Sequence, residues 1–169
     1  MVGEEDFSQN GEQAYILKAF EGQQAGRFLD LGAFHPWLLS NTRALYLRGW
    51  GGVVVDVSPL CVNSMVEEYG NSDRVAVVQA AVGMARGLTD FHVSNGAITT
   101  SSEKMHERWA GTLLFNGKLV AATITLEDIA DKFGSFDFLS IDTEGSSFEL
   151  FTSAMEIGWR PRCVCCDPK

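Results

Sequence analysis

The stretch FLDLGAFHP, residues 28–36, begins with the short apolar run FLDL, which is followed directly by Gly32. Three similar runs follow it, VVVDV at residues 53–57, VAVV at residues 75–78 and FDFLSI at residues 136–141. A fifth, weaker run occupies residues 163–166. Near-continuous apolar runs are typical of strands that are buried on both faces. These segments therefore predict the strands of a parallel sheet.

Helical patterns alternate with these runs. Apolar residues recur at helical spacing in five segments, residues 11–20, 41–48, 61–69, 126–133 and 147–157. Strand and helix in alternation indicate an α/β fold, with a mostly parallel sheet and helices on both faces.

The middle of the chain is less regular. Residues 87–93 form a candidate extra strand, whereas residues 94–118 are polar and rich in glycine. Such a long connection is either a functional lid or a partly ordered loop. Thr125 and Asp128 resemble a capping box at the start of the helix expected at residues 126–133.

Composition restricts the class of protein. The chain has 169 residues, 46% of them hydrophobic, which excludes a disordered chain and matches a single domain. Its net charge of −9 repels a phosphate backbone, so we expect no nucleic-acid partner. Residues 1–10 lack a signal-peptide pattern, and no apolar stretch is long enough to cross a membrane.

The cysteines favour a cytoplasmic protein. Three of the four lie within residues 163–166, where adjacent positions on one strand cannot easily bridge each other. Cys163 and Cys166 have C-x-x-C spacing, but no second such pair and no neighbouring histidine accompanies them, so we expect reduced thiols and no metal.

Acidic and small residues follow the expected strands. In an open parallel sheet, ligands bind beyond the carboxyl ends of the strands. Gly32 permits a close approach to the backbone, and Asp56 is placed to accept the hydroxyls of a ribose. The first turn is not G-x-G-x-x-G, so a pyrophosphate cradle is poorly supported. A ribose-bearing, cationic cofactor without a diphosphate fits better, and S-adenosylmethionine is such a cofactor.

Six segments together resemble the FkbM family of S-adenosylmethionine-dependent methyltransferases. They span nearly the whole chain in the family's order, and the S-N-T…G-W-G-G-V and S-I-D-T-E-G blocks are the most specific. The segments are FSQNGEQAYIL (7–17), FLDLGAFHP (28–36), SNTRALYLRGWGGVVVD (40–56), TITLEDI (123–129), FDFLSIDTEGSSFEL (136–150) and RPRCV (160–164).

The resemblance implies a Rossmann-like class I methyltransferase fold and a set of cofactor residues. Residues 1–22 would form an N-terminal helical flap over the cofactor, although Ser8 or Asn10 could instead simply cap the first helix. The residues implied for the cofactor run from its methionine end through its ribose to its adenine and the reaction centre: Ser8, Gln9, Asp30, Gly32, Ala33, Asn41, Asp56, Val57, Ala81 and Asp142.

The sequence departs from the family at two points. Phe34 stands where the family usually has asparagine after Gly-Ala. The sequence also ends soon after Asp167, without the two further strands that class I methyltransferases usually add. We therefore expect a sheet shortened at the C-terminus, an open edge covered by a partner such as a second copy of the chain, or a truncated gene product.

Transfer of a methyl group to a hydroxyl requires a base near the acceptor. His35 and Asp142 are the candidates, with Glu144 beside Asp142. His35 has an alternative role in a His-Pro turn, and Glu144 could cap the following helix. Asp142 and Glu144 could also hold a divalent ion, although two carboxylates make a poor site, and we expect no metal.

The two remaining histidines give less indication of a functional role. His92 is expected to be structural, and His106 to lie in a solvated surface loop.

The sequence thus predicts an S-adenosylmethionine-dependent methyltransferase, and the family resemblance implies that its acceptor is a hydroxyl of a small molecule or saccharide. Two alternatives remain open, a non-catalytic Rossmann-like binding or assembly module and a nicotinamide-dependent oxidoreductase. The missing glycines count against the second.

Overall fold

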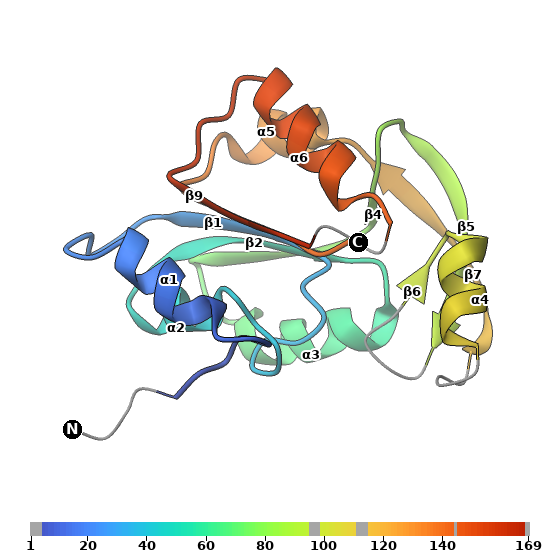
Figure 1. The fold of residues 1–169 in the computed structure, drawn as a ribbon, viewed down its shortest axis with the longest axis horizontal. Helices are drawn as coiled ribbons and strands as arrows, with labels where there is room; N and C mark the ends of the chain where they lie inside the picture. The colour runs from blue at the N-terminus through green and yellow to red at the C-terminus, as the bar shows by residue number, and fades with distance from the viewer. Residues whose placement is uncertain (1–4, 95–98, 111–114, 144, 168–169) are drawn as a thin grey trace.

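A five-stranded parallel sheet forms the centre of the computed structural model, which describes residues 5–94, 99–110, 115–143 and 145–167 (Figure 1). Its order is β3-β2-β1-β8-β9, and each neighbouring pair is parallel. The strands are β1 (Arg27–Leu31), β2 (Gly51–Asp56), β3 (Val75–Gln79), β8 (Phe138–Ile141) and β9 (Cys163–Cys166). All five coincide with the apolar runs that predicted them.

The apolar runs form strands because both faces of the sheet are covered. Every residue of β8 is buried, as are the last four residues of β1 and the three valines of β2. Strands buried on both faces gain from continuous rather than alternating apolar residues.

Helices cover both faces, and Figure 1 shows them as two layers. On one face, Ile16, Leu45 and Met65 bring α1 (Glu12–Ala19), α2 (Arg43–Leu47) and α3 (Pro59–Tyr69) into one apolar cluster with Phe28 and Val54. On the other face, α5 (Leu126–Phe133) and α6 (Ser147–Glu156) pack against Leu29, Val53 and Leu139 through a second cluster. The α/β architecture with helices on both faces is confirmed.

A second, smaller sheet stands beyond the carboxyl ends of the parallel strands (Figure 1). Its order is β4-β7-β5-β6, and β5 pairs with β7 in antiparallel register. The strands are β4 (Ala81–Val82), β5 (Gly87–Ser94), β6 (Thr99–Thr100) and β7 (Phe115–Ile124), and α4 (Glu103–Trp109) lies between the last two in sequence. The chain enters this sheet directly from β3.

The expectation of a long loop at residues 94–118 is wrong for its described part, which contains β6, α4 and the start of β7. Strand β7 is hard to predict from sequence because Leu119 to Ala122 is a short continuous apolar run that supports neither the helical nor the strand period clearly. Its strand state depends on pairing with β5, whose residues are distant in sequence. Residues 95–98 and 111–114 of the expected lid lie outside the described residues.

The described part of the expected N-terminal flap packs on the helical layer formed by α1 to α3. Phe7 is buried, its backbone oxygen accepts a hydrogen bond from Ser40 N, and its N–H donates to Gln13 Oε1. This places α1 against the sheet face. Within the described residues, no helix is both long enough and apolar enough to cross a membrane.

Candidate cofactor site

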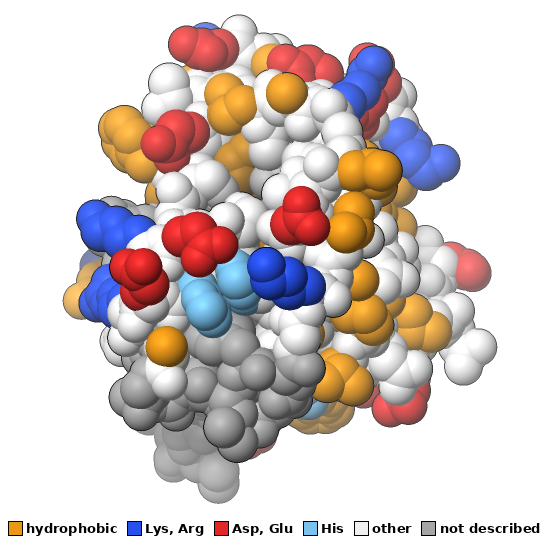
Figure 2. All heavy atoms as spheres, turned by 90° about the vertical axis from the view of Figure 1, so that its right-hand side faces the viewer, with side chains coloured by type: hydrophobic (Ala, Val, Ile, Leu, Met, Phe, Trp, Pro, Cys, Tyr) orange, Lys and Arg blue, Asp and Glu red, His pale blue; other side chains and the backbone are white. Residues whose placement is uncertain are grey.

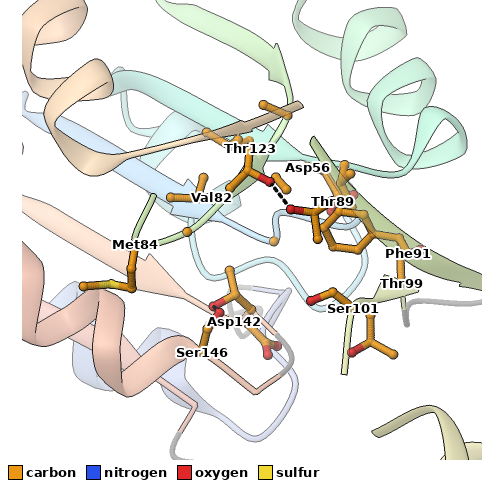
Figure 3. A pocket seen from close by; sticks show the side chains of 18 of the residues that line it. Asp56, Val82, Met84, Thr89, Phe91, Thr99, Ser101, Thr123, Asp142 and Ser146 are labelled. Atoms are coloured by element: carbon orange, nitrogen blue, oxygen red, sulfur yellow. Dashed lines mark hydrogen bonds between the residues drawn. The ribbon is translucent and has the colours of Figure 1, made fainter. Parts of the chain in front are cut away.

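A cavity of about 300 Å³ lies between the carboxyl ends of the parallel strands and the second sheet (Figure 3). Its walls come from the ends of β2 and β8, from β4 to β7, and from Ser146, the N-cap of α6. This volume is at the lower end of the range of small-molecule sites. The cavity therefore lies where open α/β sheets bind their ligands.

Asp56 ends β2 and contributes a carboxylate to this cavity. Its Oδ2 accepts from Phe34 N at 3.0 Å, and its Oδ1 accepts from Ser58 N at 2.7 Å. Burial raises the pKa of Asp56 above its usual value, while these backbone donors act in the opposite direction. A carboxylate offers about four acceptor positions. Two backbone bonds therefore fix its orientation and leave capacity for a ligand with paired hydroxyls.

Gly32 and Asp142 line the cavity where the ends of β1 and β8 adjoin. Gly32 has a φ of +75°, and a Cβ at this position would overlap the carbonyl oxygen of Asp142. Glycine is therefore required where the ends of β1 and β8 approach each other. The side chain of Asp142 is exposed at the end of β8 and lines the cavity (Figure 3).

Apolar side chains line the part of the cavity next to Asp56. Val57 follows β2, Ala81 and Val82 form β4, and Phe91 reaches in from β5. A flat aromatic base would be sandwiched by such side chains rather than recognised by charge.

Hydroxyl groups line much of the rest of the cavity. Five threonine and serine side chains labelled in Figure 3 are drawn from β5, β6, β7 and the residues beside α4 and α6: Thr89, Thr99, Ser101, Thr123 and Ser146. The hydroxyls of Thr89 and Thr123 lie 2.8 Å apart and share a hydrogen bond.

The model of the methyltransferase FkbM domain matches residues 24–166. The chain belongs to this family. FkbM methyltransferases use S-adenosylmethionine, and the Rossmann-like, class I methyltransferase-like fold expected from the sequence is confirmed.

Comparison with solved structures finds a likeness to the METTL16 MTase domain (crystal form 2), with a TM-score of 0.47 and 15% sequence identity. The matched region covers 90% of this chain and 48% of that one, so the chain spans about half the length of that structure. No curated protein matches the sequence.

The cavity fits the cofactor of the FkbM family. The Asp56 carboxylate, with acceptor capacity left over, suits the ribose hydroxyls, and the apolar wall around Ala81 and Phe91 suits the adenine. Four of the ten residues implied by the family resemblance line the same cavity as Asp56 itself: Gly32, Val57, Ala81 and Asp142.

Asp30 lies beneath the cavity rather than in its wall. It is only 4% exposed, and its Oδ2 accepts from the hydroxyl of Thr42 at 2.7 Å. Burial raises its pKa to about 6, opposed by hydrogen bonds from Thr42 and Ser140 and reinforced by the charges of Asp142 and Asp56. Asp30 thus lies near enough to Asp56 and Asp142 to be affected by their charges, and direct contact with the cofactor stays a prediction.

His35 is held in a turn outside the lining of the cavity. Its Nδ1 accepts hydrogen bonds from the backbone N–H groups of Trp37, at 3.1 Å, and Leu38, at 3.2 Å. These two backbone donors commit Nδ1 to the turn. This geometry favours the structural alternative for His35.

The other residues expected at the site do not line the cavity. Ser8 Oγ accepts from Gln13 N at the start of α1, and Gln9 is exposed on the same segment. Ala33 is buried in the cluster that holds α1 to α3. Asn41 donates to Ser140 Oγ and Cys165 Sγ, while its buried Oδ1 has no hydrogen-bond partner. Glu144 lies outside the described residues.

Sequence reasoning missed the contribution of the second sheet to the site. Thr89, Phe91 and Thr123 enter the cavity from β5 and β7, although the extra strand itself was expected. Thr89 and Phe91 are two residues apart and therefore face the same side of the strand. The sequence did not show which face of β5 lies toward the carboxyl ends of the parallel strands.

Proposed function

We propose that the chain transfers the methyl group of S-adenosylmethionine to a hydroxyl of a small molecule or saccharide. The observation that carries this proposal is a single cavity that extends from Asp56 to Asp142 and is lined by hydroxyl groups between them. The cofactor, when bound, supplies an electrophilic methyl group on a cationic sulfonium.

Asp56 binds the ribose, and Val57, Ala81 and Phe91 exclude water around the adenine. These contacts direct the methyl-donating end of the cofactor toward Gly32 and Asp142. Much of the rate of an in-line transfer comes from such alignment of donor and acceptor.

Asp142 is the base that removes the proton from the acceptor hydroxyl. Its carboxylate is exposed to the cavity and lies at the end of a rigid, fully buried strand. We assign this role to Asp142 rather than His35 because the Nδ1 of His35 is committed to the turn.

The hydroxyl-rich wall supports a polyhydroxylated acceptor. Thr99 and Ser101 from β6 and its following residue, and Ser146 at the start of α6, offer groups that both donate and accept hydrogen bonds. Such groups match the mixed donors and acceptors of a sugar ring better than they match an apolar substrate.

The cofactor assignment is tested by calorimetric titration of S-adenosylmethionine into the wild-type chain and into Asp56→Ala. We expect at least about tenfold weaker binding by Asp56→Ala, because hydrogen bonds to a charged group contribute about 1.5–3 kcal/mol. Asp90→Ala, which removes an exposed carboxylate of β5, is the matched control and should bind normally. Equal affinities of all three proteins would contradict the ribose assignment.

The catalytic assignment is tested by methyl transfer to a panel of hydroxyl acceptors that includes saccharides. Asp142→Asn should lower kcat by about 100-fold, as expected for loss of a general base, with a smaller effect on cofactor affinity. Cofactor binding without transfer to any hydroxyl would instead favour the non-catalytic binding module.

We place the protein in the cytoplasm because Cys61, Cys163, Cys165 and Cys166 are all free thiols. Thiol titration of the unfolded protein, purified without reductant, should find all of them reduced. Disulfides in freshly extracted protein would contradict this location.

A further inference from the structure

Two imidazoles and a carboxylate meet on the second sheet, outside the cofactor cavity. His92 Nε2 lies 2.9 Å from Glu103 Oε1, and His106 Nδ1 lies 3.8 Å from Glu103 Oε2. One ligand atom from each of the three residues falls within 4.8 Å of the other two. Figure 2 shows two adjoining histidine side chains on this face, with acidic side chains beside them.

Two elements that are distant in sequence build this cluster. Alternation along β5 places Phe91 in the cofactor cavity and directs the neighbouring His92 to the opposite face. Ser102 caps α4 by accepting from Met105 N, so the helix begins at Glu103. Glu103 and His106 are then one turn apart and face the same side.

We propose that His92, Glu103 and His106 bind a divalent transition-metal ion of the zinc class. Neutral imidazole nitrogens and one carboxylate oxygen are ligands that Zn²⁺ takes, at about 2.0–2.2 Å, with a water completing four-coordination. The carboxylate and the net charge of −9 favour a cation at this surface.

The donor set selects against hard cations. Mg²⁺ and Ca²⁺ prefer oxygen ligands throughout, whereas this cluster offers two nitrogens and one carboxylate. The side chains of His92 and His106 are 13% and 29% exposed and that of Glu103 is 74% exposed, so an ion can enter from solvent and keep a water ligand.

Binding requires one local rearrangement. The two imidazole rings are stacked, with centroids 3.9 Å apart and planes inclined by 11°, so their lone pairs lie in two nearly parallel planes. Rotation of one ring about its Cβ–Cγ bond directs both nitrogens toward a shared ion. This torsion has a broad energy profile in histidine, so the rotation costs little.

A metal ion at this position would tie α4 to β5. The residues between β6 and α4 include Ser101, which lines the cofactor cavity, and Ser102, whose N–H donates to Thr100 Oγ1. The ion would therefore stabilise the part of the cavity wall that contains Ser101, from the side that faces away from the cavity. It would have no contact with the reacting atoms, and the proposal does not depend on the function of the cavity.

The test is a Zn²⁺ titration of the purified full chain against a chromophoric chelator. The wild-type chain should bind one equivalent of Zn²⁺, while Mg²⁺ and Ca²⁺ should not compete. His92→Ala, His106→Ala and the near-isosteric Glu103→Gln should each weaken binding by about tenfold or more. Glu107→Gln, an exposed residue of the same helix, is the matched control and should bind like the wild type.

Cobalt absorption separates this site from the thiols. Co²⁺ bound by imidazole and carboxylate gives visible d–d bands without the intense near-ultraviolet charge-transfer band of a thiolate. Retention of Zn²⁺ affinity in folded Glu103→Gln and His106→Ala, a thiolate band, or no binding by the wild type would overturn the proposal. Circular dichroism of each variant establishes that it is folded.

Discussion

The folded state disfavours the ionised form of the Asp30 carboxyl group. The side chain is buried beneath the ends of β1 and β8, and burial raises its pKa from 3.8 to about 6. A carboxyl group whose pKa is higher in the folded state binds more protons there than in the unfolded chain. The free energy of unfolding therefore falls as the pH rises through this interval.

We predict that Asp30→Asn removes this pH dependence. Between about pH 4 and pH 6, the wild-type chain should lose about 3 kcal/mol of unfolding free energy relative to the variant. Asparagine retains an acceptor for the Thr42 hydroxyl, so the packing is preserved. Urea denaturation of both proteins across this pH range measures the difference. Parallel pH profiles would show that Asp30 ionises as it does in the unfolded chain.

Leu39 adopts a backbone conformation that leucine rarely takes. Its φ is +57°, and its side chain is 48% exposed, so it has little packing to lose. Leu39→Asn should raise the free energy of unfolding by about 1 kcal/mol, because asparagine tolerates positive φ better.

Leu38→Asn is the matched control for Leu39→Asn. Leu38 is 59% exposed and is not among the residues with positive φ, so its substitution should leave stability unchanged or slightly lower. Thermal unfolding of the two variants provides the comparison. Equal melting temperatures would exclude strain at Leu39.

Phe34 departs from the family pattern, and the structure explains why the site tolerates this side chain. It replaces the usual asparagine and has a φ of +46°, while its N–H donates to Asp56 Oδ2. The backbone, not the side chain, supplies this contact with Asp56. The substitution therefore leaves the orientation of Asp56 intact.

At the level of elements, the junction of β1 and β8 depends on Gly32. Gly32→Ala should destabilise the chain by about 2–3 kcal/mol or more, because it adds an overlap with the Asp142 carbonyl to the backbone strain.

Gly22→Ala separates the two effects at Gly32. Gly22 has a similar φ of +81° but nothing within 4 Å of a Cβ, so its substitution should cost only about 1 kcal/mol of strain. Urea denaturation of both variants gives the two costs. Equal costs would mean that β1 and β8 separate readily.

The parallel strands and their helices could be predicted because their signals are local. Val53 to Val55 form one apolar run that fills both clusters, and the expected helix at residues 126–133 matches α5 at both ends. Its capping box, Thr125 with Asp128, is a short-range pattern as well. The pairing of β5 with β7 has no such local signal.

At the level of the whole molecule, the candidate site also has one part with a local sequence signal and one part that depends on contacts between distant segments. The half that lies at the ends of the parallel strands, including Asp56 and Asp142, could be expected from sequence. The half from the second sheet, including Thr89 and Phe91, depends on how two sheets are placed together. Ser8 and Gln9 were expected near the cofactor because of their positions in a matching segment, and His35 was expected near the acceptor because it follows the first strand, but none of them lines the cavity.

The candidate cofactor cavity lies between the two sheets, whereas the proposed metal ligands His92, Glu103 and His106 lie on β5 and α4. Strand β5 contributes Phe91 to the cofactor cavity and His92 to the cluster. The second sheet is thus the element through which the two sites would influence each other.

A crystal structure of the chain with S-adenosylhomocysteine tests the central claim most directly. We expect the adenine between Ala81 and Phe91, both ribose hydroxyls within hydrogen-bond distance of the Asp56 carboxylate, and the sulfur near Asp142. A nucleoside bound elsewhere, or a ribose turned away from Asp56, would contradict the account.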